Sequence, residues 1–457
     1  MGNGRNQLLS RWTAVFVPLL FFVHIAMANL AGAQQSAERG TRTPLPAEVA
    51  RPASLYKYKA LHDFCRAFDC PDGLAPNGDL IFDAAGNLYG TTFGGGDFSP
   101  CQAVGCGTVF QLSPEGNGTW KHTILHEFHS EFEAQPSAGL VMDAAGNLYG
   151  PIACAGGCGA VFELSRQGNG TWRFATIFTF TGKNGLDPQA HLILDAAGNL
   201  YGTTVEGGNA TCPSGCGTVF ELSPKANGAW KLTTLFKFNG TNGASPYAPL
   251  IFDAAGNLYG TTAGGGNTAA CSGGCGTVFE LSPNAHGAWK RTALFKFNGT
   301  NGAGPEGGLV FDSTGNLFGT TQVGGKFNIG TVFKLSPEGN GTWKHTTLLA
   351  FDIQNGSFPT AGLIFDTAGN LYGNAQDGGF GVGIVYRLSP KDNGTWKETT
   401  LLTFNDENGS QPVGICFWMP PGTYTARRTW RASTAAASYL SFRQNEQTKQ
   451  KRSLGPF

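Results

Sequence analysis

Charge is scarce in this sequence, and neither sign is in excess. Charged residues make up 14% of the 457 residues, and 31 Lys and Arg balance 31 Asp and Glu. A chain without net charge has no general attraction to nucleic acid or to an anionic membrane surface, so we expect no nucleic-acid partner. Beyond the N-terminal segment no apolar run is long enough to span a bilayer, so we also expect no membrane span after cleavage.

The motifs of common catalytic sites are also missing. The sequence holds no G-x-S-x-G, no H-E-x-x-H and no P-loop, and runs such as FGGGDF lack the P-loop lysine. His122 and His126 share one face of a strand and His129 points the other way, while only the His122 position recurs, as His345. We interpret these side chains as exposed histidines of an outer strand and not as metal ligands. The sequence thus predicts no catalytic residue, no cofactor and no metal site.

Repetition, by contrast, dominates the chain. The phrase LIFDAAGNLYGTT begins at Leu80, and close copies return every 52 to 60 residues. Each copy is followed by GTVFELSP or a near match, and then by a strand of the form WKxTTLFxF. Glycine is abundant, at 68 residues, while Val, Ile, Leu and Phe stay frequent, which suits tight turns between buried strands. A period of this length that carries several short strands predicts a β repeat architecture.

One repeat reads as four strands joined by tight turns, which is an antiparallel meander. The segments TVFEL and LIFD carry apolar residues on both faces, whereas a sheet with one face in water would alternate. Stacking four-stranded units radially covers both faces. We therefore predict an all-β fold, a β-propeller of four-stranded antiparallel blades. The alternative is a linear β-solenoid, which usually has shorter repeats.

The number of strands predicts how the ring closes. The fourth strand occurs seven times, from Lys57–Phe64 to Trp396–Phe404, whereas the other three strands occur six times. The chain therefore begins with a lone fourth strand and should end with strands one to three, so that both ends share a blade and no open edge remains. We predict six complete blades and an orphan N-terminal strand in this chain, and seven blades in the intact gene product.

The C-terminal end departs from this pattern. After FNDENGSQPVG the repeat gives way to ICFWMPPGTYTARRTW and a basic tail. Codons can be chosen for Gly414 to Arg428 so that the same bases, shifted by two, read HLLLDAAGNLYGTT. Tyr439 to Glu446 likewise shift into FELSPE and a stop. We interpret the tail as an out-of-frame seventh repeat; the alternative is a genuine basic tail that binds a polyanion or the cell surface.

The N-terminus has the features of a secretory signal. Arg5 and Arg11 supply a positive start, an apolar core runs from Ala14 to Ala28, and the small residues AGA precede Gln34. The alternative is an uncleaved anchor helix, which so short an apolar run disfavours. We expect a monomer that is secreted or held at the cell surface. The chain then divides into a signal peptide (1–33), a linker (34–54), a β-propeller repeat domain (55–405) and the aberrant tail (406–457).

Cysteine usage agrees with export. Ten of the eleven cysteines lie in close pairs, and the eleventh is Cys416 in the tail. The predicted disulfide pairs are Cys65 and Cys70, Cys101 and Cys106, Cys154 and Cys158, Cys212 and Cys216, and Cys271 and Cys275. The last four pairs precede a strand of the CGTVF type, where disulfides would pin long loops in an oxidising compartment. A metal site is the alternative, but two later repeats lack cysteine altogether.

An aspartate opens a D-x-x-G-N turn in every full repeat. These residues are Asp83, Asp143, Asp195, Asp253, Asp312 and Asp366. We predict a structural carboxylate that accepts hydrogen bonds from the turn, with the glycine supplying a positive φ. The alternative is a calcium ligand or a catalytic group. A calcium loop needs several oxygen ligands, and DAAGN offers a single carboxylate.

Two aromatic positions also recur in every full repeat. The first holds Tyr89, Tyr149, Tyr201, Tyr259, Phe318 and Tyr372, and the second holds Trp120, Trp172, Trp230, Trp289, Trp343 and Trp396. Such rings could stack on sugars. We favour packing between blades, because blades need large residues at fixed positions.

The pair GLIFDAAGNLYGTT and GTVFELSP resembles the bacterial choice-of-anchor tandem repeat called GloVer, over roughly residues 55–404. The resemblance implies an exported repeat protein with a variable C-terminal anchor, and it implies no particular activity.

Binding specificity is expected from residues that differ between blades. They lie in Gly-rich loops such as Asp97–Cys106 and Asn209–Cys216, which would cluster on one rim of a propeller. We expect a non-enzymatic protein that binds a glycan or an extracellular protein through this rim. The alternatives are a purely structural surface array and a propeller enzyme, such as a lactonase-like hydrolase or a polysaccharide lyase. For an enzyme, His191 and Glu306 are the ionisable residues to watch.

Overall fold

The computed structural model describes residues 56–444, except for 68, 77, 100, 102–103, 117, 131–133, 154–158, 285, 380–381, 406–409, 420–422 and 430–437. The chain separates into two units, Met1–Ala53 and Ser54–Phe457, and every described element belongs to the second. The predicted signal peptide, its cleavage site and the whole linker lie outside the described residues, as does the pair Cys154 and Cys158.

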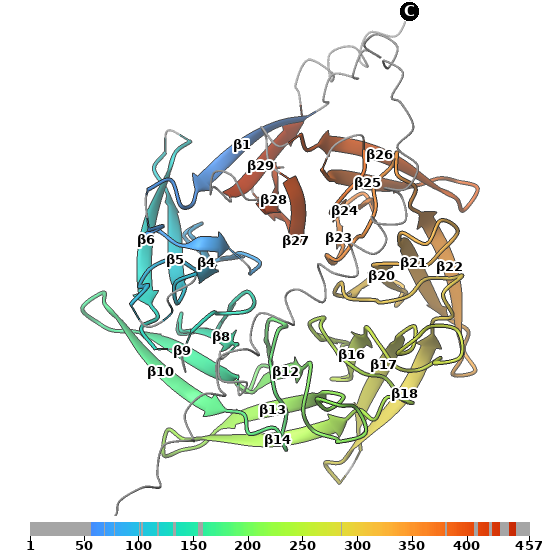
Figure 1. Cartoon of the computed structure of the whole chain (residues 1–457), viewed down its shortest axis with the longest axis horizontal. Coiled ribbons are helices and arrows are strands. Elements are labelled where there is room, and N and C mark those ends of the chain that lie inside the picture. Colours follow the sequence, from blue (N-terminus) through green and yellow to red (C-terminus); the bar gives the residue numbers. More distant parts are fainter. Residues whose placement is uncertain are drawn as a thin grey trace, which may run out of the picture. The chain divides into compact units, whose positions relative to one another are not determined.

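The described residues form antiparallel β-sheets and contain no helix. Six sheets consist of strands that are consecutive in the sequence, and each sheet is one blade. Figure 1 shows the blades around a common centre, with the fourth strands on the outside. The predicted all-β propeller with six complete blades is confirmed.

Blades 1 to 6 repeat the same four strands. The first strands are β3 (Ile81–Phe82), β7 (Val141–Met142), β11 (Ile193–Leu194), β15 (Ile251–Phe252), β19 (Val310–Phe311) and β23 (Ile364–Phe365). The second strands are β4 (Leu88–Gly94), β8 (Leu148–Ile152), β12 (Leu200–Thr204), β16 (Leu258–Thr262), β20 (Leu317–Thr321) and β24 (Leu371–Ala375). The third strands are β5 (Thr108–Pro114), β9 (Ala160–Arg166), β13 (Thr218–Pro224), β17 (Thr277–Pro283), β21 (Thr331–Pro337) and β25 (Ile384–Pro390). The fourth strands are β6 (Trp120–Glu127), β10 (Trp172–Thr179), β14 (Trp230–Lys237), β18 (Trp289–Lys296), β22 (Trp343–Ala350) and β26 (Trp396–Thr403). Blade 1 has an additional strand, β2 (Leu74–Pro76), which pairs with β4.

The third strands are covered on both faces, as the TVFEL segments predict, and so are the second strands, whereas both residues of the first strand β15 are only partly buried. All five residues of β16 are buried, and β17 is buried except at Glu280 and its last two residues. Directly after the fourth strand of each of blades 1 to 5, a phenylalanine packs onto the next blade. Phe238 meets Phe279 with ring centroids 5.3 Å apart, and both rings are fully buried. Burying a ring of this size stabilises the fold by ~1.5–3 kcal/mol, so these contacts hold neighbouring blades together.

A seventh four-stranded sheet joins the two ends of the propeller unit. Its strand order is β1 (Tyr56–Asp63), β29 (Ser438–Gln444), β28 (Thr423–Thr429) and β27 (Ser410–Met419). β1 takes the outer place of a fourth strand, and the following Phe64 packs onto Phe110 of blade 1 with centroids 4.9 Å apart. The N-terminal strand is therefore paired in this chain, and the prediction that it is an orphan here is wrong: β29 supplies its antiparallel partner, so both ends of the unit share one sheet.

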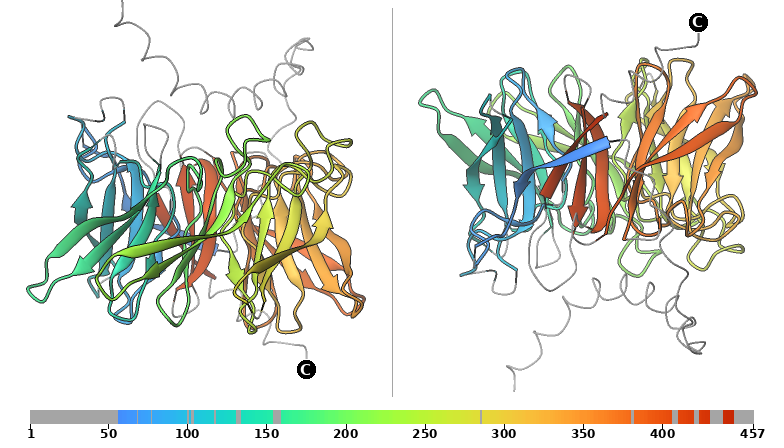
Figure 2. Two further views of the ribbon diagram at one scale, coloured as in Figure 1. Left: turned by 90° about the horizontal axis from the view of Figure 1, so that it is seen from below. Right: turned by 90° about the horizontal axis from the view of Figure 1, so that it is seen from above.

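The side views show how the chain runs through the ring. In Figure 2 the strands of all blades run between the same two faces. The segment that leads into each first strand lies on one face, and the D-x-x-G-N hairpin after that strand lies on the other. The second strand returns the chain to the first face, so the Gly-rich loops and the lead-in segments share one face.

Candidate functional site

The lead-in segments reach the centre of the ring, and their side chains differ from blade to blade. Six residues before the turn aspartate, blades 2 to 6 carry Ser137, Gln189, Tyr247, Glu306 and Thr360. Two residues later, blade 1 carries Asp79 and blade 3 carries His191, where the other blades have glycine or proline.

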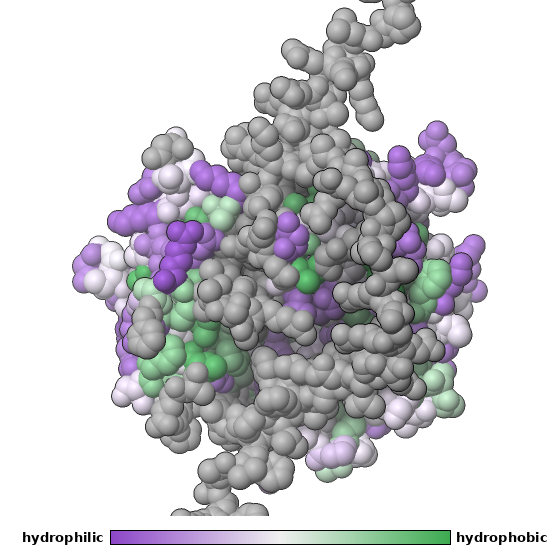
Figure 3. Space-filling view, turned by 45° about the horizontal axis from the view of Figure 1, so that its top comes forward, coloured by the Kyte–Doolittle hydropathy of each residue, from purple (hydrophilic) through white to green (hydrophobic). Residues whose placement is uncertain are grey.

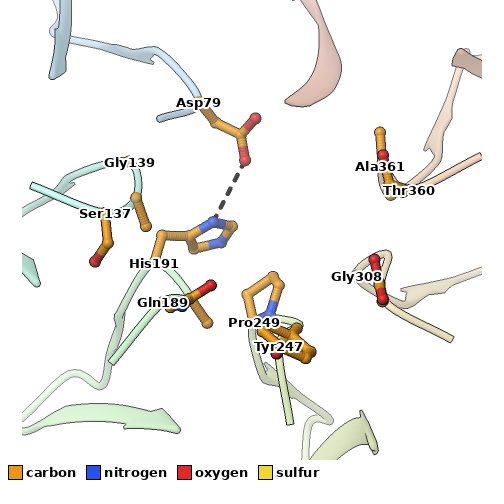
Figure 4. A pocket seen from close by; sticks show the side chains of 14 residues that line it. Asp79, Ser137, Gly139, Gln189, His191, Tyr247, Pro249, Gly308, Thr360 and Ala361 are labelled. Carbon is orange, nitrogen blue, oxygen red and sulfur yellow. Dashed lines mark ion pairs between the residues drawn. The ribbon is translucent and has the colours of Figure 1, made fainter. Parts of the chain in front are cut away.

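These side chains line one pocket on the axis of the ring, which we call the axial pocket. It encloses about 120 Å³. Its walls are Asp79, Ser137, Ala138, Gly139, Gln189, Ala190, His191, Tyr247, Pro249, Glu306, Gly308, Thr360, Ala361 and Gly362. Figure 4 shows the labelled members around a common space, and Figure 3 shows hydrophilic side chains at the centre of the ring. All six blades therefore contribute to one polar site.

Backbone hydrogen bonds fix each lead-in segment on two sides. In blade 4, Ala244 exchanges two bonds of 2.9 Å with Gly264 of the same blade. Ser245 donates its N–H to the carbonyl of Cys216 in blade 3, over 3.0 Å, and its φ of 55° lies in the left-handed region. The segment that carries Tyr247 is thus tied both to its own blade and to the preceding one.

Side chains of the second strands add further hydrogen bonds between neighbouring blades. We call these contacts between a lead-in segment and the preceding blade the blade joints. Thr203 of blade 3 donates to the carbonyl of Pro246 in blade 4, over 3.0 Å. The equivalent Thr261 of blade 4 is 1% exposed, and its hydroxyl has no hydrogen-bond partner among the described residues. An unsatisfied buried hydroxyl costs ~1–3 kcal/mol. The lead-in segment of blade 5 is therefore held without this side-chain bond.

An ion pair crosses the axial pocket. His191 Nδ1 of blade 3 and Asp79 Oδ2 of blade 1 are 3.4 Å apart, and the two side chains are 26% and 24% exposed. Figure 4 shows this pair spanning two lead-in segments. The pair brings together residues far apart in the sequence, and both side chains remain accessible from the pocket.

Two other pocket residues, Tyr247 and Glu306, have raised pKa values, as do two acidic groups that interact with Tyr247. Burial raises the pKa of Glu306 to about 7, and no described residue donates a hydrogen bond to its carboxyl group. Burial also raises the pKa of Tyr247, and the charges of Glu306, Asp187 and Glu206 add to this effect. The pKa of Asp187 is raised by burial, and that of Glu206 by burial and by the charge of Asp187.

The described walls of the pocket supply no Lys or Arg to balance these acids. The single imidazole among the described residues that line the pocket, His191, faces Asp79. The described part of the chain also contains no group of three or more His, Cys, Asp and Glu side chains with the geometry of a metal site. The pocket is therefore suited to a neutral polyhydroxyl ligand or to a cation, and it disfavours an anion.

The disulfides lie beside the lead-in segments. The structure has bonds between Cys65 and Cys70, Cys101 and Cys106, Cys212 and Cys216, and Cys271 and Cys275. In three of these pairs the second cysteine provides the carbonyl that accepts the N–H of the next lead-in segment. The disulfides in the Gly-rich loops thus stabilise the backbone hydrogen bonds that hold the lead-in segments, and these segments carry the pocket residues.

The turn aspartates lie on the far face and are occupied by their own turns. Oδ1 of Asp253 accepts the N–H groups of Ala255 and Asn257, both over 2.9 Å. Its Oδ2 accepts the side-chain amide of Asn257, over 2.7 Å, and the hydroxyl of Tyr259, over 3.1 Å. Burial opposes ionisation, but these bonds outweigh it and lower the pKa of Asp253.

The recurrent aromatic residues pack between blades. Tyr201 of blade 3 is 7% exposed and meets Trp289 of blade 4 edge-on, with centroids 6.4 Å apart. Tyr149 and Trp230 make the same contact one blade earlier, at 5.8 Å. These rings are engaged in blade packing, which the sequence favoured over stacking on a sugar.

The prediction of exposed outer-strand histidines is wrong for three of the four. His122, His126 and His345 are partly buried, because each lies against the outer strand of the neighbouring blade. His345 stacks on Phe295 with centroids 4.6 Å apart, and burial lowers its pKa to about 4. Only His129 is exposed, where its Nδ1 lies 3.0 Å from Asp97 Oδ2.

Sequence reasoning identified two members of the axial pocket, His191 and Glu306. It missed Asp79, Gln189 and Tyr247. The available signal was positional: these residues interrupt a lead-in sequence that is otherwise small and apolar from blade to blade. That signal becomes meaningful only when the ring brings the lead-in segments together.

The fold and the repeated turn chemistry define a β-propeller repeat protein. Within that class, the chain belongs to the Gloeobacter/Verrucomicrobia repeat family. The family's sequence profile matches residues 51–228, 103–290, 154–381 and 270–424, in overlapping registers.

Similar solved structures are distant. They include a protein of unknown function from Dyadobacter fermentans (9% identity, 84% of this chain and 98% of that one, TM-score 0.44). They also include the PQQ-bound aldose sugar dehydrogenase of Streptomyces coelicolor (12% identity, 86% of this chain and 100% of that one, TM-score 0.41). A third is a luciferin-regenerating enzyme (13% identity, 85% of this chain and 95% of that one, TM-score 0.39). Likenesses this weak carry no argument about function. No curated protein matches the sequence. Among the described residues, no helix has the length and apolar character needed to cross a membrane.

Proposed function

We propose that this chain is an exported, non-enzymatic binding protein that recognises a glycan at the face carrying the axial pocket and the Gly-rich loops. The observation that carries the proposal is the convergence of unlike polar side chains at one repeat position. Gln189, Tyr247, Glu306 and Thr360 take the same place in four blades, and all of them line one pocket. A purely structural ring has no need of this diversity.

The chemistry of the pocket suits a sugar. Amide, hydroxyl, phenol, imidazole and carboxyl groups together donate and accept hydrogen bonds in many directions, as the hydroxyl groups of a sugar require. A pocket of about 120 Å³ is small, so it suits a single sugar unit or a chain end. The surrounding Gly-rich loops lie on the same face and offer further contact for a longer glycan, consistent with the rim predicted from the sequence.

Disulfides in three Gly-rich loops support export, because such bonds persist in oxidising compartments. The signal-like N-terminus supports the same compartment. A secreted or surface-held location in turn makes a glycan a plausible partner class.

The test is calorimetric titration of the exported protein with neutral, amino and acidic oligosaccharides. We expect saturable binding that Tyr247→Ala weakens by about tenfold, which equals ~1.4 kcal/mol. The control is Gln167→Ala. This residue lies in the hairpin after β9 of blade 2, on the face opposite the axial pocket, so the substitution should leave binding unchanged. Binding that is equal in both variants would contradict the proposed site.

A specific observation favours an enzyme as the second candidate. His191 faces Asp79 across the pocket, and an imidazole oriented by a carboxylate can act as a general base. The acidic surroundings disfavour uronate substrates, and so a polysaccharide lyase, more than a lactonase-like hydrolase. Turnover of lactones or glycans, followed as acid release or new reducing ends and lost in His191→Ala, would establish this alternative. Binding without turnover supports the first proposal.

A further inference from the structure

We propose that the axial pocket recognises an ammonium group, and that the natural ligand is an amine-bearing glycan whose amino group lies between Tyr247 and Glu306. This inference rests on the proposed function and names the chemical class of its ligand.

The first argument is the pairing of an aromatic ring with a carboxyl group. Tyr247 of blade 4 and Glu306 of blade 5 occupy the same repeat position in adjacent blades, and both line the pocket. The charge of Glu306 also contributes to the raised pKa of Tyr247, so the two groups interact electrostatically. An aromatic ring attracts a cation through its π face, and a carboxylate forms charge-assisted hydrogen bonds with an ammonium group.

The second argument is the accessibility of the Glu306 carboxyl group. No described residue donates a hydrogen bond to the Glu306 carboxyl group. The turn aspartate Asp253, by comparison, accepts four. Glu306 is partly exposed and lines the pocket, and its oxygens are not among the buried atoms that lack a partner, so they are accessible to a donor on a ligand.

The third argument is the charge around Tyr247. Asp187 and Glu206 lie on the side of blade 3, Glu306 lies on the side of blade 5, and the nearest imidazole, His191, is directed at Asp79. Among the described residues that line the pocket there is no Lys or Arg to balance these acids. A cation is therefore attracted here, whereas a carboxylated or sulfated sugar is repelled.

Proton linkage distinguishes an ammonium group from a neutral sugar. The pKa of Glu306 is about 7, so the carboxyl group is partly protonated near neutral pH. A cation favours the ionised form, so its binding releases protons and its affinity rises from pH 5 to pH 8. A neutral sugar that accepts a hydrogen bond from the protonated acid would bind more weakly over the same rise.

The first experiment is a competition titration with glucosamine trimer and its fully N-acetylated counterpart, at pH 6. The two differ in the charge and acylation of the same nitrogen. We expect the amino trimer to bind at least about tenfold more tightly, and Glu306→Gln to remove this preference. The control is Glu398→Gln on β26, another carboxyl group whose pKa burial raises but which lies outside the pocket. This control should leave the preference intact.

The second experiment follows n-butylammonium, which stays charged across the range, by titration from pH 5 to pH 8. We expect affinity to rise with pH in the wild-type chain and to become flat in Glu306→Gln. Equal binding of the two trimers at the pocket would overturn the ammonium proposal and leave glycan binding standing. Failure of every oligosaccharide in the panel, amino and neutral alike, would overturn both.

Discussion

At the scale of single residues, the place of a polar side chain in the repeat decides its role. A carboxylate at the turn position, such as Asp253, is held by four hydrogen bonds within its own hairpin. A carboxylate in a lead-in segment, such as Glu306, reaches the axis, where no described residue donates a bond to it. The first kind builds the blade, and the second is available to a ligand. The D-x-x-G-N motif made the turn role predictable, whereas the role of Glu306 depends on neighbours from other blades.

The buried outer-strand histidines predict a pH-dependent stability. His345 has a pKa of about 4 in the folded chain, against an ordinary value of 6.5. Between these values the unfolded chain binds more protons, so the free energy of unfolding falls as the pH falls from about 6.5 to about 4. In His345→Phe, which keeps a ring against Phe295, the drop in Tm from pH 7 to pH 5 should be smaller.

The control for this measurement is His286→Phe, at an exposed hairpin position. Its thermal unfolding should keep the pH dependence of the wild-type chain. An unchanged Tm difference in His345→Phe would show that this imidazole is not excluded from protonation by the fold.

At the scale of elements, the strands and hairpins were predictable because their signals are local. Tight-turn residues and a repeated order of four strands are visible in any one repeat. The joints between blades were less accessible to sequence reasoning. The bond from Ser245 to the carbonyl of Cys216 and the stacking of His345 on Phe295 both connect different blades. The first of these contacts also holds the lead-in segment that carries Tyr247 of the axial pocket.

The phenylalanines after the fourth strands should dominate the stability of these joints. Phe297 is fully buried, and its ring centroid lies 5.2 Å from that of Phe333 in blade 5. Phe297→Ala should lower the free energy of unfolding by ~3–5 kcal/mol, since it leaves a cavity between two blades. Phe327→Ala, at a ring that is 48% exposed, should change it by less than ~0.5 kcal/mol. Urea unfolding followed by tryptophan fluorescence measures both, and equal losses would contradict this account of blade packing.

At the scale of the whole propeller unit, the seventh sheet decides how the ring closes. Its four strands come from both ends of the unit, and β1 pairs with β29 in antiparallel register. Gln411 and Pro412 still follow the repeat: Gln411 has a φ of 46° and donates its N–H to the carbonyl of Val382 in blade 6, over 2.6 Å. The hydrogen bond that holds a lead-in segment to the preceding blade is therefore still present at Gln411, just before the repeat sequence is lost.

The frameshift stays a prediction, and the strand positions agree with it. In the shifted reading NLYGTT falls on β28 and FELSP on β29, which are the second and third places of a blade. The nucleotide sequence of the codons from Asn405 to Phe457 should reveal one missing or extra base near Gly414. If the nucleotide sequence keeps the given reading frame, and if no other frame encodes the repeat, the basic tail is native.

Direct observation of a ligand on the axis tests the account most sharply. The measurement is a crystal structure of the exported protein with glucosamine trimer. We predict that one sugar unit occupies the axial pocket with its amino group within hydrogen-bond distance of Glu306 and beside Tyr247. A trimer bound only on the outer strands or on the far face, or no bound trimer at saturating concentration, would contradict the claim that the axial pocket is the binding site.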